Sequence, residues 1–189
     1  MFVNNINPVL FHLGPFAITW YGIIFASSVF LGYLIASHIA IKKKLFTENE
    51  TEEFFIYFVV AAVVGSRVAS VISEWRYYSQ NPLEIFMTWH GGLAFHGGLI
   101  GVILIGWWYS KKHKKDFFAI ADIIIIPLAF GLGFGRIANF INGEFYGTIT
   151  NLPWGVKFQG VEGFRHPVQL YESLKNFLIF GFLWFLKDK

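Results

Sequence analysis

The chain has 189 residues, of which 55% are hydrophobic and only 14% are charged. Soluble proteins carry about 25% charged residues, so this composition favours a membrane protein over a soluble enzyme. The small formal net charge of +3 does not indicate nucleic acid as a partner, and the absence of cysteine excludes disulfides, thiolate metal sites and a cysteine nucleophile within these residues.

Long apolar runs predict an all-α fold, a polytopic membrane helix bundle of about five spans in a single transmembrane domain over residues 1–189. The fifth span is the least apolar, because Glu172 and Lys175 lie in its first turns. We expect those turns to face protein or water rather than lipid. An outer loop is expected at 136–166. The predicted spans lie near residues 16–41, 54–73, 91–109, 117–135 and 167–186.

Lysine clusters orient these spans, because the cytoplasmic loops of membrane proteins carry an excess of Lys and Arg. One cluster follows each odd-numbered span: Lys42–Lys44, the lysines between Lys111 and Lys115, and Lys187 with Lys189. The N-terminus is therefore expected outside and the C-terminus inside. The loops at 74–90 and 136–166 then lie on the outer side, and both are aromatic and poor in lysine.

Polar groups gather at one depth when the predicted spans are aligned. A helix rises about 1.5 Å per residue, which places polar residues from all five spans within roughly 10 Å of the outer surface. Asp122, near the inner side of the fourth span, is the exception. A shared depth indicates a site in the outer leaflet. The residues in this layer are Tyr21, Arg67, His96, Arg136, His166, Gln169, Tyr171 and Glu172.

The 135–147 motif, Gly-Arg-Ile-Ala-Asn-Phe-Ile-Asn-Gly-Glu-Phe-Tyr-Gly, follows directly on an apolar run. A lone arginine at such a place commonly extends its side chain to the membrane interface. Here Arg136 is followed by Asn139, Asn142 and Glu144, and glycines allow the backbone to turn tightly or approach a ligand. These neighbouring residues favour a phosphate-binding role for Arg136, because the planar guanidinium presents a fork of donors to phosphate oxygens.

His96 and Arg67 also lie inside predicted spans. His96 precedes Gly97 and Gly98, which permit close helix packing or close approach of a substrate. A helix–helix hydrogen bond and general acid–base work both fit His96, and its shared depth favours the second. For Arg67 we expect a structural ion pair with Glu74, Glu144 or Glu172. No metal site is expected, because the histidines lack helical ligand spacing.

At these residues the chain resembles the prolipoprotein diacylglyceryl transferase family. The 135–147 motif fits the family pattern throughout, and three further blocks occur in the family's order, so that the resemblance covers nearly the whole chain. Agreement of all four blocks by chance is implausible. The supporting blocks are Trp20-Tyr21-Gly22, Phe95-His96-Gly97-Gly98-Leu99 and the 165–172 motif, Arg-His-Pro-Val-Gln-Leu-Tyr-Glu.

The resemblance implies a multi-pass enzyme of the bacterial cytoplasmic (inner) membrane. Its reaction transfers the diacylglyceryl group of phosphatidylglycerol to the lipobox cysteine of a prolipoprotein signal peptide, at the outer face, and releases glycerol 1-phosphate. Arg136 would hold the phosphate and His96 would take the thiol proton as the second catalytic group. The acyl chains would stay in membrane lipid, so no cofactor is expected. Substrate-binding roles are implied for Arg136, Tyr21, Asn139, Glu144, Gly147, Glu172 and His166.

One departure from the family concerns length. Family members commonly continue with two further spans and an additional arginine, so this chain is expected to be a fragment or an abbreviated member. The smaller departure is Leu93-Ala94 before Phe95, where Met-Ser is usual. The alternative function is a lipid or small-solute transporter, which would carry polar groups through the full membrane depth. Only Asp122 leaves the outer layer, which disfavours that alternative.

Overall fold

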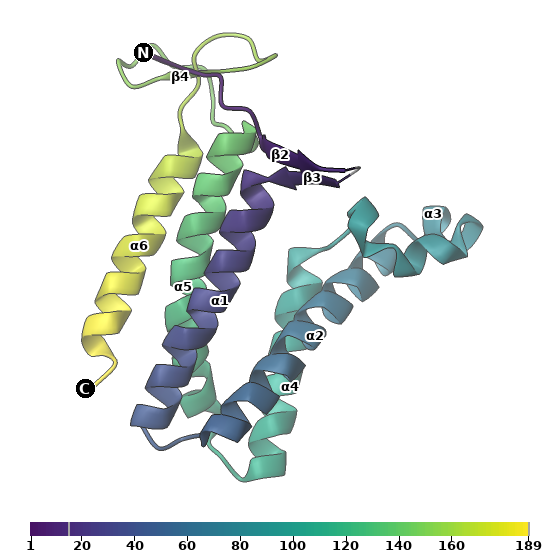
Figure 1. Ribbon diagram of the computed structural model, residues 1–189, viewed down its shortest axis with the longest axis vertical. Helices are drawn as coiled ribbons and strands as arrows, with labels where there is room; N and C mark the ends of the chain where they lie inside the picture. The colour runs from purple at the N-terminus through teal and green to yellow at the C-terminus, as the bar shows by residue number, and fades with distance from the viewer. Residues whose placement is uncertain (15, 189) are drawn as a thin grey trace. The chain divides into compact units, whose positions relative to one another are not determined.

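Figure 1 shows the chain as a computed structural model that describes residues 1–14 and 16–188. The chain is mostly helical and divides into two compact units, one of Met1–Ala36 with Ile124–Lys189 and one of Ser37–Ile123. Among the described residues, three helices are long and apolar enough to cross a membrane: α1 (Trp20–Lys42), α2 (Glu48–Ser73) and α5 (Phe117–Asn142). A helical membrane protein is therefore confirmed.

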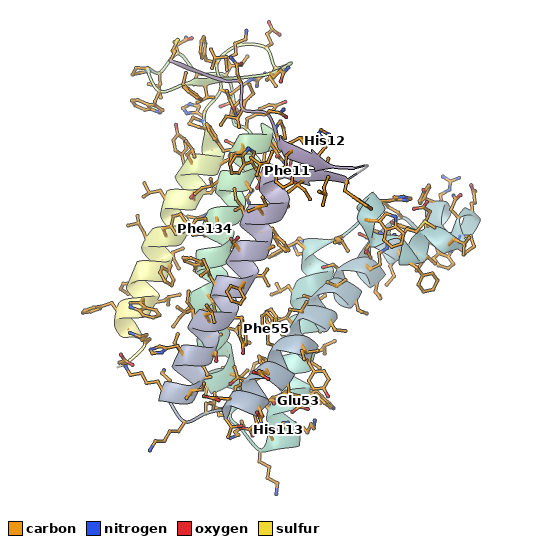
Figure 2. All side chains as sticks on the ribbon, viewed as in Figure 1. Phe11, His12, Glu53, Phe55, His113 and Phe134 are labelled. Atoms are coloured by element: carbon orange, nitrogen blue, oxygen red, sulfur yellow. The ribbon has the colours of Figure 1, made fainter. Side chains whose placement is uncertain are left out.

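The first unit is built on three helices that lie side by side in Figure 1: the first part of α1, the second part of α5, and α6 (Val168–Leu186). Aromatic rings join α5 to α6. Phe134, labelled in Figure 2, meets the edge of Phe177 with the ring centroids 5.0 Å apart. Gly133 makes room for this contact, since a Cβ there would lie 2.7 Å from the Phe177 ring.

Four short strands accompany these helices, and the all-α prediction missed them. β2 (Val9–Leu13) and β3 (Phe16–Thr19) form an antiparallel hairpin, and β1 (Phe2–Asn4) pairs in parallel with β4 (Val156–Phe158). The first predicted span began at residue 16, whereas α1 begins at Trp20. Phe16 is apolar but 71% exposed in its strand. Hydropathy therefore marked the apolar run correctly but not the strand within it.

Helix α5 continues beyond its apolar part. The predicted fourth span ended at residue 135, but the helix runs to Asn142 and so includes Arg136 and Asn139. The first seven residues of the expected outer loop are therefore helical. Polar side chains ended the apolar run without ending the helix, because an α-helix needs only its backbone bonds and a compatible environment.

The second unit is an antiparallel pair, α2 and α4 (Phe95–His113). Glycines bring the two backbones into direct contact: a Cβ on Gly65 would strike the carbonyl of Gly97, and a Cβ on Gly97 would strike the carbonyl of Gly65 and the methyl of Ala69. Small residues at a helix crossing allow this close approach. Of the two roles expected for the glycines after His96, close helix packing is the one seen.

One end of this pair carries the charged cluster that follows α4 in sequence. Figure 2 shows Glu53 and His113 at the same end of α2 and α4. Lys112 Nζ lies 2.7 Å from Glu53 Oε1, and His113 Nδ1 lies 3.4 Å from Glu50 Oε1. Tyr109 is fully buried beneath them, and its hydroxyl donates to the backbone carbonyl of Glu50 (2.8 Å). These contacts fix the register of α4 on α2.

The other end carries the connection between α2 and α4, which contains α3 (Trp75–Gln80) and two 3-10 turns, η1 (Pro82–Phe86) and η2 (Thr88–His90). Arg67 organises this connection. Its Nε donates to the carbonyl of Ile85 (2.9 Å), and its two terminal nitrogens donate to the carbonyls of Glu84, Met87, Gly91 and Gly92.

The expectation of an ion pair between Arg67 and Glu74, Glu144 or Glu172 was wrong, because Arg67 donates to backbone carbonyls instead. The side chain is only 6% exposed, and all of its nitrogens are used by backbone oxygens, with the ring of Tyr78 5.0 Å from its Cζ. A tight loop holds many carbonyls that need donors when it is buried, and a guanidinium carries five donor hydrogens. Arg67 therefore holds the connection between α2 and α4 together through these hydrogen bonds.

Candidate functional site

Arg136 and Glu172 form an ion pair between α5 and α6. Arg136 Nε lies 2.6 Å from Glu172 Oε2, and the two side chains are 36% and 33% exposed. The ring of Phe145 lies 6.0 Å from the Arg136 Cζ. A guanidinium that is held through Nε presents its terminal nitrogens as a separate pair of donors. Arg136 is thus oriented by a carboxylate and remains open to solvent or ligand.

The turn after α5 places Glu144 over the end of the helix. The amides of Gly143 and Glu144 donate to the carbonyls of Phe140 (3.1 Å) and Asn139 (3.0 Å). Asn142 Nδ2 donates to Glu144 Oε1 (2.9 Å), so the carboxylate is tied back to the helix. Asn139 is buried in the last turns of α5, 8% exposed. Glu144 is therefore linked to the Asn142 side chain and to the Asn139 backbone.

Phe145 adopts an unusual backbone conformation within this turn. Its φ is +55°, a left-handed value that residues with a Cβ seldom take, and it follows Gly143 at +72°. Its side chain is 67% exposed although it is large and apolar. Strained residues persist where surrounding contacts enforce them, and they gather at functional sites. The unusual conformation of Phe145 occurs beside Arg136, whose Cζ lies 6.0 Å from the ring.

Gln169 connects α6 to the same turn. It is 1% exposed, and its Nε2 donates to the backbone carbonyl of Glu144 (2.6 Å). Its Oε1 is buried without a hydrogen-bond partner in the part of the chain that the structure describes. The sequence placed Gln169 in the polar layer but assigned it no role. Its spacing three residues before Glu172 was the available signal, because positions i and i+3 share a helix face.

Gly147 and His166 close the base of the connection between α5 and α6. The Gly147 amide donates to the His166 carbonyl (2.9 Å), and the His166 amide donates to Thr148 (3.0 Å). A Cβ on Gly147 would lie 2.6 Å from Val168 Cγ2 and 2.9 Å from His166 Cβ. Gly147 therefore allows its backbone to lie close to His166 and Val168. It joins the 135–147 motif to the 165–172 motif.

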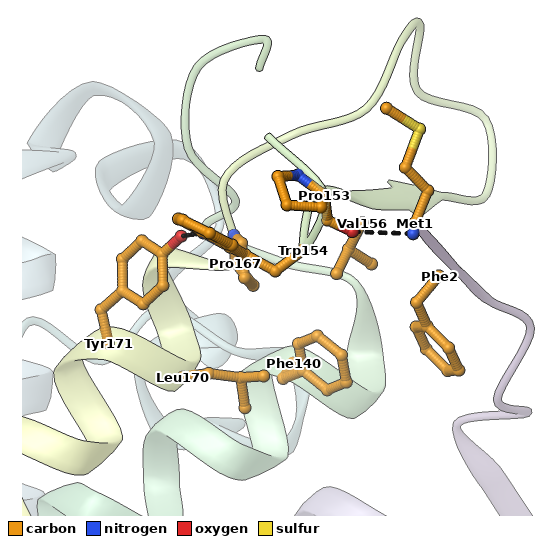
Figure 3. A pocket seen from close by; sticks show the side chains of 9 residues that line it. All are labelled: Met1, Phe2, Phe140, Pro153, Trp154, Val156, Pro167, Leu170 and Tyr171. Carbon is orange, nitrogen blue, oxygen red and sulfur yellow. Dashed lines mark hydrogen bonds between the residues drawn. The ribbon is translucent and has the colours of Figure 1, made fainter. Parts of the chain in front are cut away.

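A hydrogen-bonded row of side chains flanks the site. Trp154 Nε1 donates to the Tyr171 hydroxyl (2.8 Å), which lies 3.2 Å from His166 Nδ1. Beside this row lies an open, mainly apolar groove of about 550 Å³, shown in Figure 3. The side chains that line the groove are Met1, Phe2, Phe140, Pro153, Trp154, Val156, Pro167, Leu170 and Tyr171.

The remaining two expected site residues lie at the starts of helices. Tyr21 is the second residue of α1 in the first unit, 38% exposed, with its ring stacked on Phe25 at 6.3 Å. His96 is the second residue of α4 in the second unit, exposed, and in edge contact with Phe95 at 5.7 Å. The first unit thus contains every expected site residue except His96.

Comparison with known proteins identifies the family of the chain. The family model described as prolipoprotein diacylglyceryl transferase matches residues 8–189. The chain belongs to this family. It is 43% identical over 183 residues to the phosphatidylglycerol–prolipoprotein diacylglyceryl transferase of Rickettsia canadensis (strain McKiel), an alignment that covers 95% of this chain and 70% of the relative.

Two further relatives in this transferase family agree. The enzyme of the same description from Rickettsia bellii (strain OSU 85-389) is 42% identical over 179 residues, with 93% of this chain and 68% of the relative covered. That of Rickettsia felis (strain ATCC VR-1525 / URRWXCal2) is 41% identical over 179 residues, with 93% and 69% covered. The family predicted from four sequence blocks is confirmed, and with it the transferase class.

Proposed function

We propose that this chain transfers the diacylglyceryl group of phosphatidylglycerol to the lipobox cysteine of a prolipoprotein. One observation carries the proposal. The 135–147 and 165–172 motifs converge through three contacts: Arg136 Nε with Glu172 Oε2 (2.6 Å), Gln169 Nε2 with the Glu144 carbonyl (2.6 Å), and the Gly147 amide with the His166 carbonyl (2.9 Å). A guanidinium oriented within such a group suits a phosphate diester as substrate.

The proposed reaction is a substitution at the carbon of the diacylglyceryl group that bears the phosphate. The cysteine thiol loses its proton, its sulfur forms a bond to that carbon, and the carbon–oxygen bond to phosphate breaks. The leaving group keeps the bonding electrons and departs as glycerol 1-phosphate. The products are a thioether-linked diacylglycerol and the free phosphate monoester. The growing negative charge on the leaving oxygen is the feature that a catalyst must stabilise.

Arg136 is the group proposed to stabilise that charge. A guanidinium group binds phosphate oxygens in a planar, two-pronged manner. Glu172 keeps the side chain oriented through Nε, which supports binding of phosphate at the terminal nitrogens. Asn139, Glu144 and Tyr21 are proposed to bind the glycerol head group, with Gly147 and His166 shaping the same surface.

His96 is proposed to take the thiol proton. A cysteine thiol has a pKa of about 8.5 and must ionise before it attacks, and an imidazole titrates near neutrality. The exposed position of His96 at the start of α4 leaves it open to a substrate. Its location on the rigid α2–α4 pair would hold the ring in place.

We further propose a five-span arrangement in the bacterial inner membrane, with the N-terminus outside and the C-terminus inside. Helices α4 and α6 have 19 residues each, about 28 Å at 1.5 Å per residue, which approaches the hydrocarbon thickness of about 30 Å. Their most apolar stretches of 18 residues are less apolar than those of α1, α2 and α5, because α4 ends with Lys111 and Lys112, and α6 contains Glu172 and Lys175. Membrane lipid, phosphatidylglycerol and a signal peptide are the expected partners.

The test is a transfer assay with the purified chain in vesicles, phosphatidylglycerol labelled in its acyl chains, and a lipobox peptide. Label should move to the peptide only when the peptide contains its cysteine. Arg136→Lys should lower the rate at least about tenfold, since a point charge replaces the fork, and His96→Gln at least about 100-fold. Near-normal rates would refute those two roles. Label that crosses the bilayer without reaching the peptide would favour a transporter.

A further inference from the structure

Asn4 is buried although it lies in a short strand close to the N-terminus. It is 5% exposed, while its neighbours Val3 and Asn5 are exposed. Its Nδ2 donates to the backbone carbonyl of Phe140 (2.6 Å), and its Oδ1 accepts from the amide of Ile6 (3.1 Å). A side-chain amide that is buried with both of its ends bonded is held in one orientation.

The carbonyl that Asn4 reaches belongs to the last turn of α5. The final four carbonyls of a helix have no partner within the helix and need donors from elsewhere. Phe140 lies in this turn, two residues before the end of α5 at Asn142. Its carbonyl receives one bond from the Gly143 amide (3.1 Å) and a second from Asn4. Because residues four apart are neighbours on a helix, Phe140 lies directly above Arg136.

The strand that carries Asn4 also holds the far side of the motif. β1 pairs in parallel with β4, and Asn4 lies opposite Phe158 in this pairing. Phe158 is 1% exposed, and its ring meets the rings of Phe140 (5.8 Å) and Tyr146 (5.5 Å). Tyr146 follows Glu144 by two residues. Asn4 thus lies where the N-terminal strand, the end of α5 and the turn after it come together.

We propose that Asn4 is a positioning residue of the transfer site, which acts on Arg136, Asn139 and Glu144 by holding the last turn of α5. The inference rests on the proposed function. Without the Asn4 donor, the Phe140 carbonyl keeps only the hydrogen bond from the Gly143 amide. The turn in which the Glu144 amide bonds to the Asn139 carbonyl then becomes less rigid. A change of about 1 Å at an oriented group is sufficient to slow a reaction strongly.

The decisive variant is Asn4→Asp, because it changes the donor and little else. The new carboxyl keeps the acceptor for the Ile6 amide. When ionised, it turns an oxygen without a proton toward the Phe140 carbonyl, and when protonated it donates a hydrogen bond again. Burial and the facing carbonyl both disfavour the charged form, so the new group should have a pKa above the ordinary value of about 3.9.

We therefore expect a pH-dependent loss of transfer activity per folded protein. At pH 8 the variant should be about tenfold slower than the wild type, and the ratio of the two rates should recover as the pH falls toward 5. The ratio removes the effect of thiol ionisation, which is common to both proteins. Asn4→Ala should be slow at every pH. Asn5→Ala, at the exposed neighbouring position, is the matched control and should behave as wild type. A ratio that does not change with pH would overturn the proposal.

A second measurement needs no turnover. Amide hydrogen exchange should quicken at Gly143 and Glu144 in Asn4→Ala and stay unchanged in Asn5→Ala. Unchanged exchange in Asn4→Ala would overturn the positioning role, and faster exchange with full activity would overturn its importance for transfer. A wild-type chain that transfers no label would refute the proposed function, whereas the exchange result would still test the contact of Asn4 with α5.

Discussion

Arg67 and Arg136 show how one residue type serves two purposes in the same chain. Arg67 is 6% exposed and donates only to backbone carbonyls, whereas Arg136 is about a third exposed and meets a carboxylate through one nitrogen. Both arginines were expected in the outer layer, and an ion pair was wrongly expected for Arg67. Backbone carbonyls are the same in every sequence, so a side chain that binds them leaves no complementary residue to find.

Replacement of Arg67 by lysine should disturb the loop at residues 84–92. Lysine offers three donors on one nitrogen and cannot reach five carbonyls on different sides of the side chain. Carbonyls left buried without donors cost about 1–3 kcal/mol each, so Arg67→Lys should lower the free energy of unfolding by at least about 2 kcal/mol. Thermal unfolding in detergent measures the loss.

The matched control for this change is Arg76→Lys. Arg76 lies on the exposed surface of α3, near the same loop, and its replacement should change stability by less than about 0.5 kcal/mol. Hydrogen exchange should quicken at residues 84–92 in Arg67→Lys alone. Equal stability of the two variants would show that the carbonyl contacts of Arg67 do not hold the loop.

At the scale of elements, apolar runs identified the helices well and their boundaries less well. The fifth predicted span, 167–186, agrees closely with α6 at Val168–Leu186. Helix α2 begins at Glu48, six residues before the predicted span, at a capping box formed by Thr47 and Glu50. That signal was present in the sequence. Hydropathy does not reveal this start, because it reports contact with lipid and not the extent of a helix.

The strands could not be predicted for a different reason. β1 has three residues, and its partner β4 lies more than 150 positions later in the chain. Short strands carry too few residues for a clear alternation of apolar and polar positions, and their pairing depends on the fold around them. The contact of Asn4 with Phe140 is non-local in the same way. The sequence offered no local pattern to announce it.

The close packing of α2 on α4 can be tested by substitution of a glycine at the contact. A Cβ on Gly97 would overlap the Gly65 carbonyl and the Ala69 methyl, both on a helix that cannot yield locally. Gly97→Ala should therefore push the helices apart and lower the free energy of unfolding by about 1–3 kcal/mol. Gly181→Ala, in α6 where nothing lies within 4 Å of the added atom, should be neutral or stabilising. Thermal unfolding of the two variants makes the comparison, and a stable Gly97→Ala would contradict the packing.

In the whole molecule, the membrane class and the family were predictable from the sequence, and the structure adds which motifs meet. The 135–147 and 165–172 motifs belong to one unit and are joined by side-chain and backbone bonds, whereas His96 belongs to the other. Depth counting from the predicted span ends put all of these residues in one layer. It could not assign them to units, because hydropathy contains no information on which helices pack together.

The number of spans decides on which side of the membrane the 135–147 motif lies. If all five long helices cross, the lysines that end α4 are inside and the connection after α5 is outside. If only α1, α2 and α5 cross, α4 stays outside, α5 crosses inward, and the connection after it lies inside. Both arrangements place the connection after α2 outside, but they place the ends of α4 and α5 on opposite sides of the membrane. Reagents that label one side of the membrane therefore distinguish them.

Single-cysteine variants suit this question because the chain has no cysteine. Gln80→Cys, Lys111→Cys and Gln159→Cys change exposed residues in the connection after α2, at the end of α4 and in the connection after α5. With five spans, a membrane-impermeant maleimide should label positions 80 and 159 in intact spheroplasts, and position 111 only after lysis. With three spans, positions 80 and 111 would react and position 159 would be protected. Protection at 159 would put the site on the inner side, away from the outer face proposed for the acceptor thiol, and would overturn the proposed arrangement.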